Sequence, residues 1–336
     1  MTQKRQSLII SGLHYQKLVN RQHQKTMFDT VNFWIDRGDT AEGNPFAVLP
    51  YLCEVVEQQS DKRGYSCSGK LGDYVVCCFQ TGVSLKGSLA KYYLPSNVYT
   101  LTRQTAKEAL EQMSEALHLD MATAKVTRLD VSTVIPTKRP PTDYYSGLGN
   151  KPNFKRLQAH PDTLYYSQKY RQLIFYDKTK EASTKGALIP PTLNGCNLLR
   201  YEIRFLSHAQ RLLKSADPIT GATLTESGFY YSIIQRWKSE FDTIKKINTI
   251  STMTDSIKTP KDAQKALFAI LLQQGGQSQI DDFLNDLKAK NAFSDPKYYS
   301  RLKADLYKIL QAPNEAKSDM IRELEKAVAD VAQYAR

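Results

Sequence analysis

Two predicted strands each place one carboxylate among arginines. The segment RLDVS carries Arg128 and Asp130 on its polar face, and the segment RYEIR carries Glu202 between Arg200 and Arg204. The intervening residues are apolar or aromatic and point to the other face. If the two strands are neighbours in one sheet, the carboxylates form a site for Mg²⁺ or Mn²⁺, hard cations that prefer carboxylate oxygen. The alternative interpretation is a set of cross-strand ion pairs with no catalytic role.

A third segment, LIFYDK, runs from apolar residues into Tyr176 and Lys178. A tyrosine hydroxyl beside a metal-bound phosphate can attack phosphorus, which frees a 3′-hydroxyl and leaves the 5′-phosphate on the protein. Lys178, or one of the flanking arginines, would offset the charge that builds on the phosphate. Tyr176 is therefore the expected nucleophile, although the chain has 20 tyrosines and a core or surface role is the ordinary one for each.

The positive charge of the chain is concentrated around these segments. Residues 124–214 contain 16 Lys and Arg against 6 Asp and Glu, which supplies ten of the chain's net charge of +12. Basic side chains mixed with aromatic ones are typical of a surface that binds nucleic acid, and the alternative is an ordinary solvated loop. The predicted DNA contacts are Arg128, Lys138, Arg139, Lys155, Arg156, Lys169, Arg171, Arg200 and Arg204.

The elements that must position these residues indicate an α+β protein. Short β-rich runs with turn signals between them fill most of residues 27–205 and predict an antiparallel sheet flanked by helices. Helical periodicity then dominates, with apolar positions such as Leu267, Leu271 and Phe283 at core spacing. We predict an N-terminal extension over 1–26, a catalytic domain over 27–214 and a mainly helical C-terminal domain over 215–336.

Several classes of protein are excluded or disfavoured. No apolar run approaches the roughly 18 residues of a membrane span, so we expect a cytoplasmic protein without membrane contact. The five cysteines form no C-x-x-C pair, so we expect neither a zinc site nor a disulfide. His208 and Arg211 match the H-x-x-R of tyrosine recombinases, but the β-rich context disfavours that mostly helical class, and we expect His208 in the first turn of a helix.

In order and spacing, the three segments resemble the signature of the filamentous-phage gene II/X type replication initiators. Arg-Leu-Asp ends at Asp130, Tyr-x-Lys spans Tyr176 to Lys178, and Arg-aromatic-Glu ends at Glu202. The likeness extends to Met27-Phe28-Asp29 and to Leu85-Lys86-Gly87-Ser88-Leu89, and it covers about residues 27–206.

The resemblance implies a rolling-circle initiator, an endonuclease that nicks one strand at an origin, stays attached through a tyrosine and later rejoins the strand. Tyr176 falls on the nucleophile of that family, Asp130 and Glu202 on its acidic positions, and Lys178 on its lysine. The implied fold is similar to the wider superfamily of nicking initiators. Most of its members bind metal through a His-hydrophobic-His pair, which this sequence and its gene II-type relatives lack.

A related plasmid family without that histidine pair is similar at the segment TLYYS, where its attacking residue falls on Tyr165. Tyr165 is therefore the second candidate nucleophile, and its neighbour Tyr166 is the third. Two other functions stay open: an origin-binding protein without catalysis, and a metal-dependent nuclease that uses water. An assay for nicking and for a covalent adduct separates all three.

The resemblance also implies the partners. They are double- and single-stranded origin DNA and replication proteins of a bacterial host. A host helicase is among them, because the chain has no Walker-type phosphate loop. The C-terminal helices carry little net charge, and we expect them to pack on themselves, on a host protein or on a second subunit in a homodimer.

Overall fold

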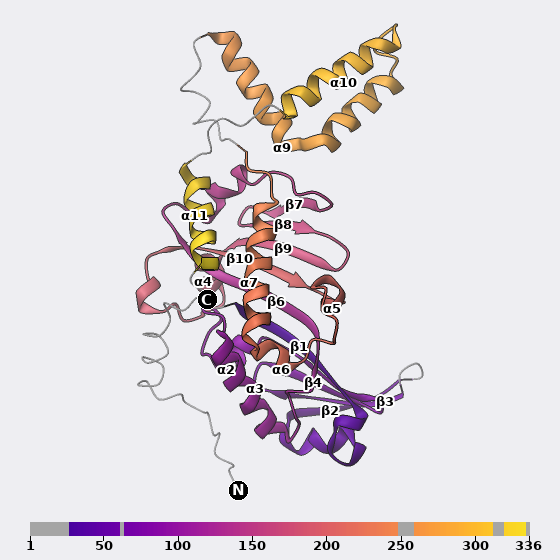
Figure 1. The fold of residues 1–336 in the computed structure, drawn as a ribbon, viewed down its shortest axis with the longest axis vertical. Helices are drawn as coiled ribbons and strands as arrows, with labels where there is room; N and C mark the ends of the chain where they lie inside the picture. Colours follow the sequence, from indigo (N-terminus) through magenta and orange to yellow (C-terminus); the bar gives the residue numbers. More distant parts are fainter. Residues whose placement is uncertain (1–26, 61–63, 248–258, 312–318, 334–336) are drawn as a thin grey trace.

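A single ten-stranded antiparallel sheet organises the molecule (Figure 1). The computed structural model describes residues 27–60, 64–247, 259–311 and 319–333, so the predicted extension over 1–26 lies outside the described residues. The strand order is β2-β3-β4-β5-β1-β6-β10-β9-β8-β7. The strands are β1 (Phe28–Asp36), β2 (Cys53–Ser60), β3 (Gly64–Leu71), β4 (Tyr74–Phe79), β5 (Gly82–Lys86), β6 (Lys125–Thr137), β7 (Lys155–His160), β8 (Thr163–Ser167), β9 (Arg171–Asp177) and β10 (Asn197–Phe205).

Alternation along the strands gives the sheet two unlike faces. On β6 and β10, Leu129, Val131, Tyr201 and Ile203 point into one continuous core, and we call this side the helix face. The residues between them point the other way, and we call that side the open face. Asp130, Glu202 and the arginines predicted beside them therefore share the open face.

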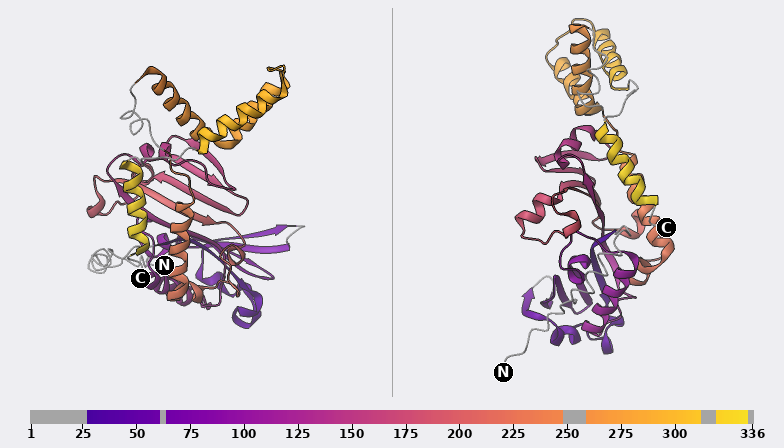
Figure 2. Two further views of the ribbon diagram at one scale, coloured as in Figure 1. Left: turned by 45° about the horizontal axis from the view of Figure 1, so that its top comes forward. Right: turned by 90° about the vertical axis from the view of Figure 1, so that its left-hand side faces the viewer.

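Helices cover the helix face along most of its length. Buried residues of these helices belong to the same core as the sheet, and Figure 2 shows the helices together on one side. They are α2 (Leu89–Tyr93), α3 (Arg103–Leu117), α6 (Gly221–Thr225), α7 (Ser227–Asp242) and α11 (Asp319–Gln333). Thr102 and Thr105 form a reciprocal capping box that starts α3. The short helix α5 (Ala209–Leu212) begins after His208, which is its N-cap in a left-handed conformation.

One end of the open face is covered by a smaller element. Helix α4 (Lys178–Thr184) follows β9 directly, and Asp177 caps it by accepting from the Lys180 amide at 2.9 Å. Ala182 of α4 packs with Leu198 and Val98 in a satellite cluster on this side of the sheet. Farther along the same face, Asp130 is 1% exposed and has Arg128 and Arg204 beside it, each about one third exposed.

Helices α9 (Pro260–Ala289) and α10 (Pro296–Gln311) form a hairpin beyond the β7 end of the sheet (Figure 1). Gly276 interrupts α9 with a φ of 70°. The expectation of core positions at Leu267, Leu271 and Phe283 is wrong, because each is about half exposed. The small core of the hairpin forms instead around Ile280, Leu284 and Leu306, where α10 packs against α9.

The structure confirms the predicted α+β class, with a large antiparallel sheet and a mainly helical C-terminal region. The domain boundary near residue 215 stays a prediction. Helices α7 and α11 from beyond that point contribute to the core under the sheet. No helix within the described ranges is both long and apolar enough to cross a membrane. Short 3-10 helices occur at Arg37–Asp39, Ala41–Gly43, Pro45–Tyr51, Pro141–Gly147 and Pro191–Leu193.

Candidate active site on the open face

Strand register brings the two predicted carboxylates together. β6 and β10 are neighbours, with Arg204 opposite Asp130 and Glu202 opposite Ser132. The Arg204 Nε atom lies 2.5 Å from Glu202 Oε1 and 3.8 Å from Asp130 Oδ2. Arg128 donates from Nε and Nη2 to the two oxygens of Asp130 at 2.9 and 2.7 Å. Both carboxylates are therefore paired with arginines. The short pairs lie within one strand, and only the 3.8 Å contact of Arg204 with Asp130 crosses from β10 to β6.

Burial makes these carboxylates difficult to ionise together. Asp130 and Glu202 are 1% and 2% exposed. Burial is the main cause that raises the pKa of Asp130 to about 7; the Arg128 hydrogen bonds oppose this shift, and the charge of Glu202 adds to it. A carboxyl that titrates near neutral pH beside a second carboxylate is unusual and marks the pair as a candidate functional site.

A fully buried arginine lies directly beside the carboxylate pair. Arg200 is 0% exposed, and its Nη2 donates to Asp29 Oδ2 at 2.5 Å and to Ser132 Oγ at 2.7 Å. It also donates to the backbone carbonyl of Asn97, and its Nε is 3.7 Å from Glu202 Oε2. Arg200 therefore fixes Glu202 and joins β1, β6 and β10 to the loop before α3.

Tyr176 lies on the open face next to this arginine. In the register of β9 and β10, Tyr176 lies opposite Arg200 and is therefore diagonal to Glu202 on the neighbouring strand. Burial raises the pKa of Tyr176 well above its usual value, the Arg200 charge opposes this shift and the Glu202 charge adds to it. Tyr176 is therefore a neutral phenol whose pKa is affected by the charge of Glu202. Its side chain is partly exposed to solvent.

Lys178 lies behind Tyr176, at the first position of α4. Its side chain is completely buried, and its Nζ atom donates to Asn97 Oδ1 at 2.8 Å and to Glu181 Oε2 at 2.5 Å. The Nζ atom is 6.0 Å from the centre of the Tyr176 ring. Burial, followed by the charge of Arg200, lowers the pKa of Lys178 to about 8.

The two other candidate tyrosines lie on opposite faces. Tyr165 is on the open face, opposite Ile174 of β9, which in turn is opposite Glu202 of β10. Tyr166 is on the helix face, fully buried, and donates to the carbonyls of Leu148 and Gly149. Tyr165 therefore lies one strand farther from Glu202 than Tyr176, and Tyr166 has its hydroxyl inside the core.

The predicted DNA contacts divide into exposed and internal side chains. Lys138, Arg139, Lys155 and Lys169 are exposed, and Arg128 and Arg204 are about one third exposed on the open face. Three others point inward. Arg171 pairs with Glu240 of α7 at 2.5 Å, Arg156 donates to the carbonyls of Leu148 and Tyr145, and Arg200 is buried. These three stabilise the fold in the conformation described.

A comparison with protein families matches residues 27–225 to the N-terminal part of a phage replication-associated protein, the gene II protein. The matched range includes β1 to α6, and with them Asp130, Tyr176 and Glu202. The chain belongs to this family. The resemblance to gene II type initiators is thereby confirmed, and the general role is in the initiation of phage DNA replication. A comparison with curated proteins found no match.

Asp130 and Glu202 are the carboxylates on the open face that could hold a hard divalent cation. Both are buried, on neighbouring strands, and the charge of Glu202 raises the pKa of Asp130. Among the residues that the structure describes, no His, Cys, Asp or Glu joins them in a group of three. Mg²⁺ often uses one or two protein carboxylates and takes its remaining ligands from water and substrate phosphate, so a pair is sufficient.

Sequence reasoning did not include Asp29, Asn97 or Glu181 in the site. Asp29 is already present in the segment Met27-Phe28-Asp29 that carries the resemblance, so a signal existed. Simple alternation along β1 does not predict which face of the sheet Asp29 points to, because the register shifts between Phe28 and Val31. Asn97 lies in a loop and Glu181 in a short helix, and neither has a local pattern that points to Lys178.

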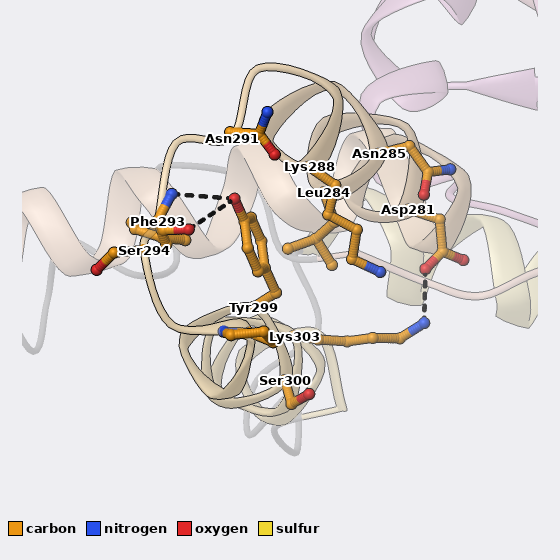
Figure 3. A pocket seen from close by; sticks show the side chains of 11 residues that line it. Asp281, Leu284, Asn285, Lys288, Asn291, Phe293, Ser294, Tyr299, Ser300 and Lys303 are labelled. Atoms are coloured by element: carbon orange, nitrogen blue, oxygen red, sulfur yellow. Dashed lines mark hydrogen bonds and ion pairs between the residues drawn. The ribbon is translucent and has the colours of Figure 1, made fainter.

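A pocket of about 530 Å³ lies elsewhere, in the α9–α10 hairpin (Figure 3). Lys303 crosses it to reach Asp281 at 3.0 Å, and Tyr299 accepts a hydrogen bond from the Phe293 amide at 2.9 Å. None of its lining residues belongs to the carboxylate site. The candidate site is therefore separate from this cavity, and its buried carboxylates lie on the sheet beside the partly exposed Arg128 and Arg204.

Proposed function

We propose that the chain is a DNA-nicking and joining enzyme that starts rolling-circle replication at an origin. The observation that supports this most directly is that Asp130, Glu202 and Tyr176 lie on one open face of three adjacent strands. The carboxylates themselves are buried. Arg128 and Arg204, each about one third exposed beside them, are the side chains that an extended substrate would meet first on this face.

The reaction is a transesterification. The Tyr176 oxygen attacks phosphorus, the bond from phosphorus to the 3′-oxygen breaks, and the phenolic proton ends on the departing 3′-hydroxyl. The 5′-phosphate stays on Tyr176, and attack by a 3′-hydroxyl reverses the step and rejoins the strand. The number of phosphodiester bonds is conserved, so neither step needs an energy source.

Asp130 and Glu202 would hold a divalent cation, Mg²⁺ or Mn²⁺. When bound, such an ion polarises the scissile phosphate and lowers the cost of the negative charge that develops on it. Arg128 and Arg204 are partly exposed beside the carboxylates and positioned to bind phosphate oxygens of the DNA. Arg200 acts as a positioning residue, because it is fully buried and holds Glu202 and Asp29.

Lys178 supports the same step from behind the tyrosine. Its ammonium group lies 6.0 Å from the Tyr176 ring centre, where a positive charge favours the phenolate form and the anionic phosphate. Because its pKa is about 8, the group still carries its charge in most molecules at neutral pH. Glu181 and Asn97 hold it in place.

The test uses a supercoiled plasmid that carries the origin of the replicon encoding this chain, incubated with protein and Mg²⁺ or Mn²⁺. We expect a nicked circle with protein attached to its 5′ end. Tyr176→Phe should lose both the nick and the adduct, and Tyr165→Phe, the matched control on the same face, should keep both.

Other outcomes distinguish the alternatives. An adduct that persists in Tyr176→Phe and disappears in Tyr165→Phe assigns the nucleophile to Tyr165. Nicking without any adduct indicates a nuclease that uses water, and binding without nicking indicates an origin-binding protein. Dependence on a host helicase and on a homodimer belongs to the same proposal, and it is tested by reconstitution with host proteins and by sedimentation.

A further inference from the structure

An aromatic pair lies on the open face at some distance from the carboxylates. Trp34 of β1 alternates with Phe33 and Ile35, which are buried in the core, so its indole points to the open face. Phe79 of β4 lies beside it, with ring centres 6.2 Å apart and ring planes inclined by 31°. Both rings are partly exposed, so they offer an aromatic surface to solvent.

The surrounding strands hold the indole in a defined position. Trp34 Nε1 donates to Asp36 Oδ1 at 2.8 Å. A Cβ atom at Gly82 of β5 would overlap the Ile35 carbonyl oxygen and would be 2.8 Å from Trp34 Cζ2. The glycine thus leaves room for the backbone of β1 and for the indole. Ser84, opposite Trp34 in the register, is 9% exposed beneath it.

Register connects this pair to the candidate active site. Trp34 is opposite Lys125 of β6, and Asn32, two residues before it, is opposite Arg128, with a register shift between them. The extra residue of β6 at this shift keeps Lys125, Arg128 and Asp130 on one face. Asp130 is five residues from Lys125, which corresponds to about 17 Å along an extended strand. The aromatic pair and the carboxylates are therefore two sites on one continuous surface.

Three cationic side chains lie between the two sites, and two of them are ion-paired with carboxylates. Arg128 lies next to Asp130, and Lys86 of β5 is exposed on the same face, opposite Val75. Lys125 is exposed beside Trp34, although it also pairs with Asp36. A chain of phosphates could follow these side chains while its bases reach the rings.

We propose that Trp34 and Phe79 form a stacking platform for unpaired bases of the DNA strand that is bound at the carboxylate site. The inference rests on the proposed function, because it assumes that DNA occupies the open face. Aromatic rings stack on bases of any sequence, but bases inside a duplex are already stacked on one another. The platform therefore selects single-stranded DNA near the nick, and it adds affinity without reading the sequence.

Tryptophan fluorescence tests the platform without nicking. The chain has two tryptophans, and the second, Trp237, is completely buried on the helix face. Titration of the full chain with a 15-nucleotide oligo-dT in EDTA should quench the emission of Trp34. A 15-unit abasic strand of equal charge, and a duplex of the same length, should leave it nearly unchanged.

Variants provide the second readout. Trp34→Leu and Phe79→Leu should each bind oligo-dT at least about fivefold more weakly, which is the lower range for loss of one stacked base. Tyr231→Leu is the matched control, because Tyr231 is an exposed aromatic residue on α7 and not on the open face. It should bind as the unmodified chain does.

The proposal is overturned if oligo-dT binds without quenching, or if the abasic strand quenches equally. It is also overturned if emission shifts with protein concentration in the absence of DNA, because the rings would then join two copies of the chain. Phe79→Leu keeps Trp34, so it reports on the platform even where Trp34→Leu fails to fold. Because EDTA prevents metal-dependent nicking, a chain that binds and quenches but never nicks refutes only the proposed function.

Discussion

The buried pair of Arg200 and Asp29 gives the strongest prediction about stability. Replacing Asp29 by Asn keeps the size and shape of the side chain but removes its charge. The Arg200 guanidinium, which is 0% exposed, would then lose the carboxylate at 2.5 Å and keep only Glu202 at 3.7 Å as an anionic partner. A buried charge without close compensation is strongly destabilising.

The expected cost follows from this geometry. Removing one partner of a buried ion pair costs about 3 to 5 kcal/mol. Glu202, Ser132 and the Asn97 carbonyl still contact Arg200, so we expect a value near the lower limit, about 3 kcal/mol. With a urea slope of about 3 kcal/mol per M, this loss moves the unfolding midpoint down by about 1 M.

The assay is urea unfolding followed by far-UV circular dichroism. Asp242→Asn is the matched control, because Asp242 pairs with Lys238 at the same distance of 2.5 Å but is about half exposed. Such a surface pair contributes under about 1 kcal/mol. Adding Arg200→Leu to Asp29→Asn should recover part of the loss, since the uncompensated charge is then gone. If Asp29→Asn costs no more than Asp242→Asn, the pair is not the anchor that we describe.

Three further predictions concern single groups. Mn²⁺ should raise the melting temperature more at about pH 8 than at about pH 6, because the pKa of Asp130 is about 7 and binding requires the ionised form; Asp130→Asn should lose the shift, and an equal shift at both pH values contradicts the site. The pKa of Lys178 is lowered to about 8 in the folded chain. Between about pH 8 and about pH 10 the unfolded chain therefore binds more protons than the folded chain, so this group makes stability rise with pH in that window. Urea unfolding of Lys178→Met should show the smaller rise, and equal slopes would refute this. Tyr166→Phe should cost about 1 to 2 kcal/mol, because two buried carbonyls lose their donor, without changing adduct formation on the origin plasmid.

The elements that carry the site were predictable because their patterns are local. Alternation around Asp130 and Glu202 gave both the strands and the face, and the chain order of the segments pointed to a known family. The sequence alone does not show whether β6 and β10 are neighbours. The structure shows that they are, with Arg204 opposite Asp130. The burial of each side chain was not predictable, because it depends on which parts of the sheet the helices and neighbouring side chains cover.

Long-range contacts explain most of what the sequence could not show. Asp29 and Arg200 are 171 residues apart, and no spacing rule connects them. Charge counting treated Arg156 and Arg171 as part of the DNA surface, whereas their side chains bind carbonyls and a buried glutamate. A count of charges reports net sign over a segment, and it cannot separate cations that face solvent from those that stabilise the interior.

The width of the sheet determines how DNA has to travel over it. Neighbouring strands in a sheet are usually rotated by about 20°, so the nine steps across ten strands amount to roughly half a turn. From β4, which carries Phe79, to β8, which carries Tyr165, there are six steps and a rotation of about 120°. A strand of DNA that touches both ends of the open face therefore winds around the protein, which a flexible single strand does easily and a stiff duplex does not.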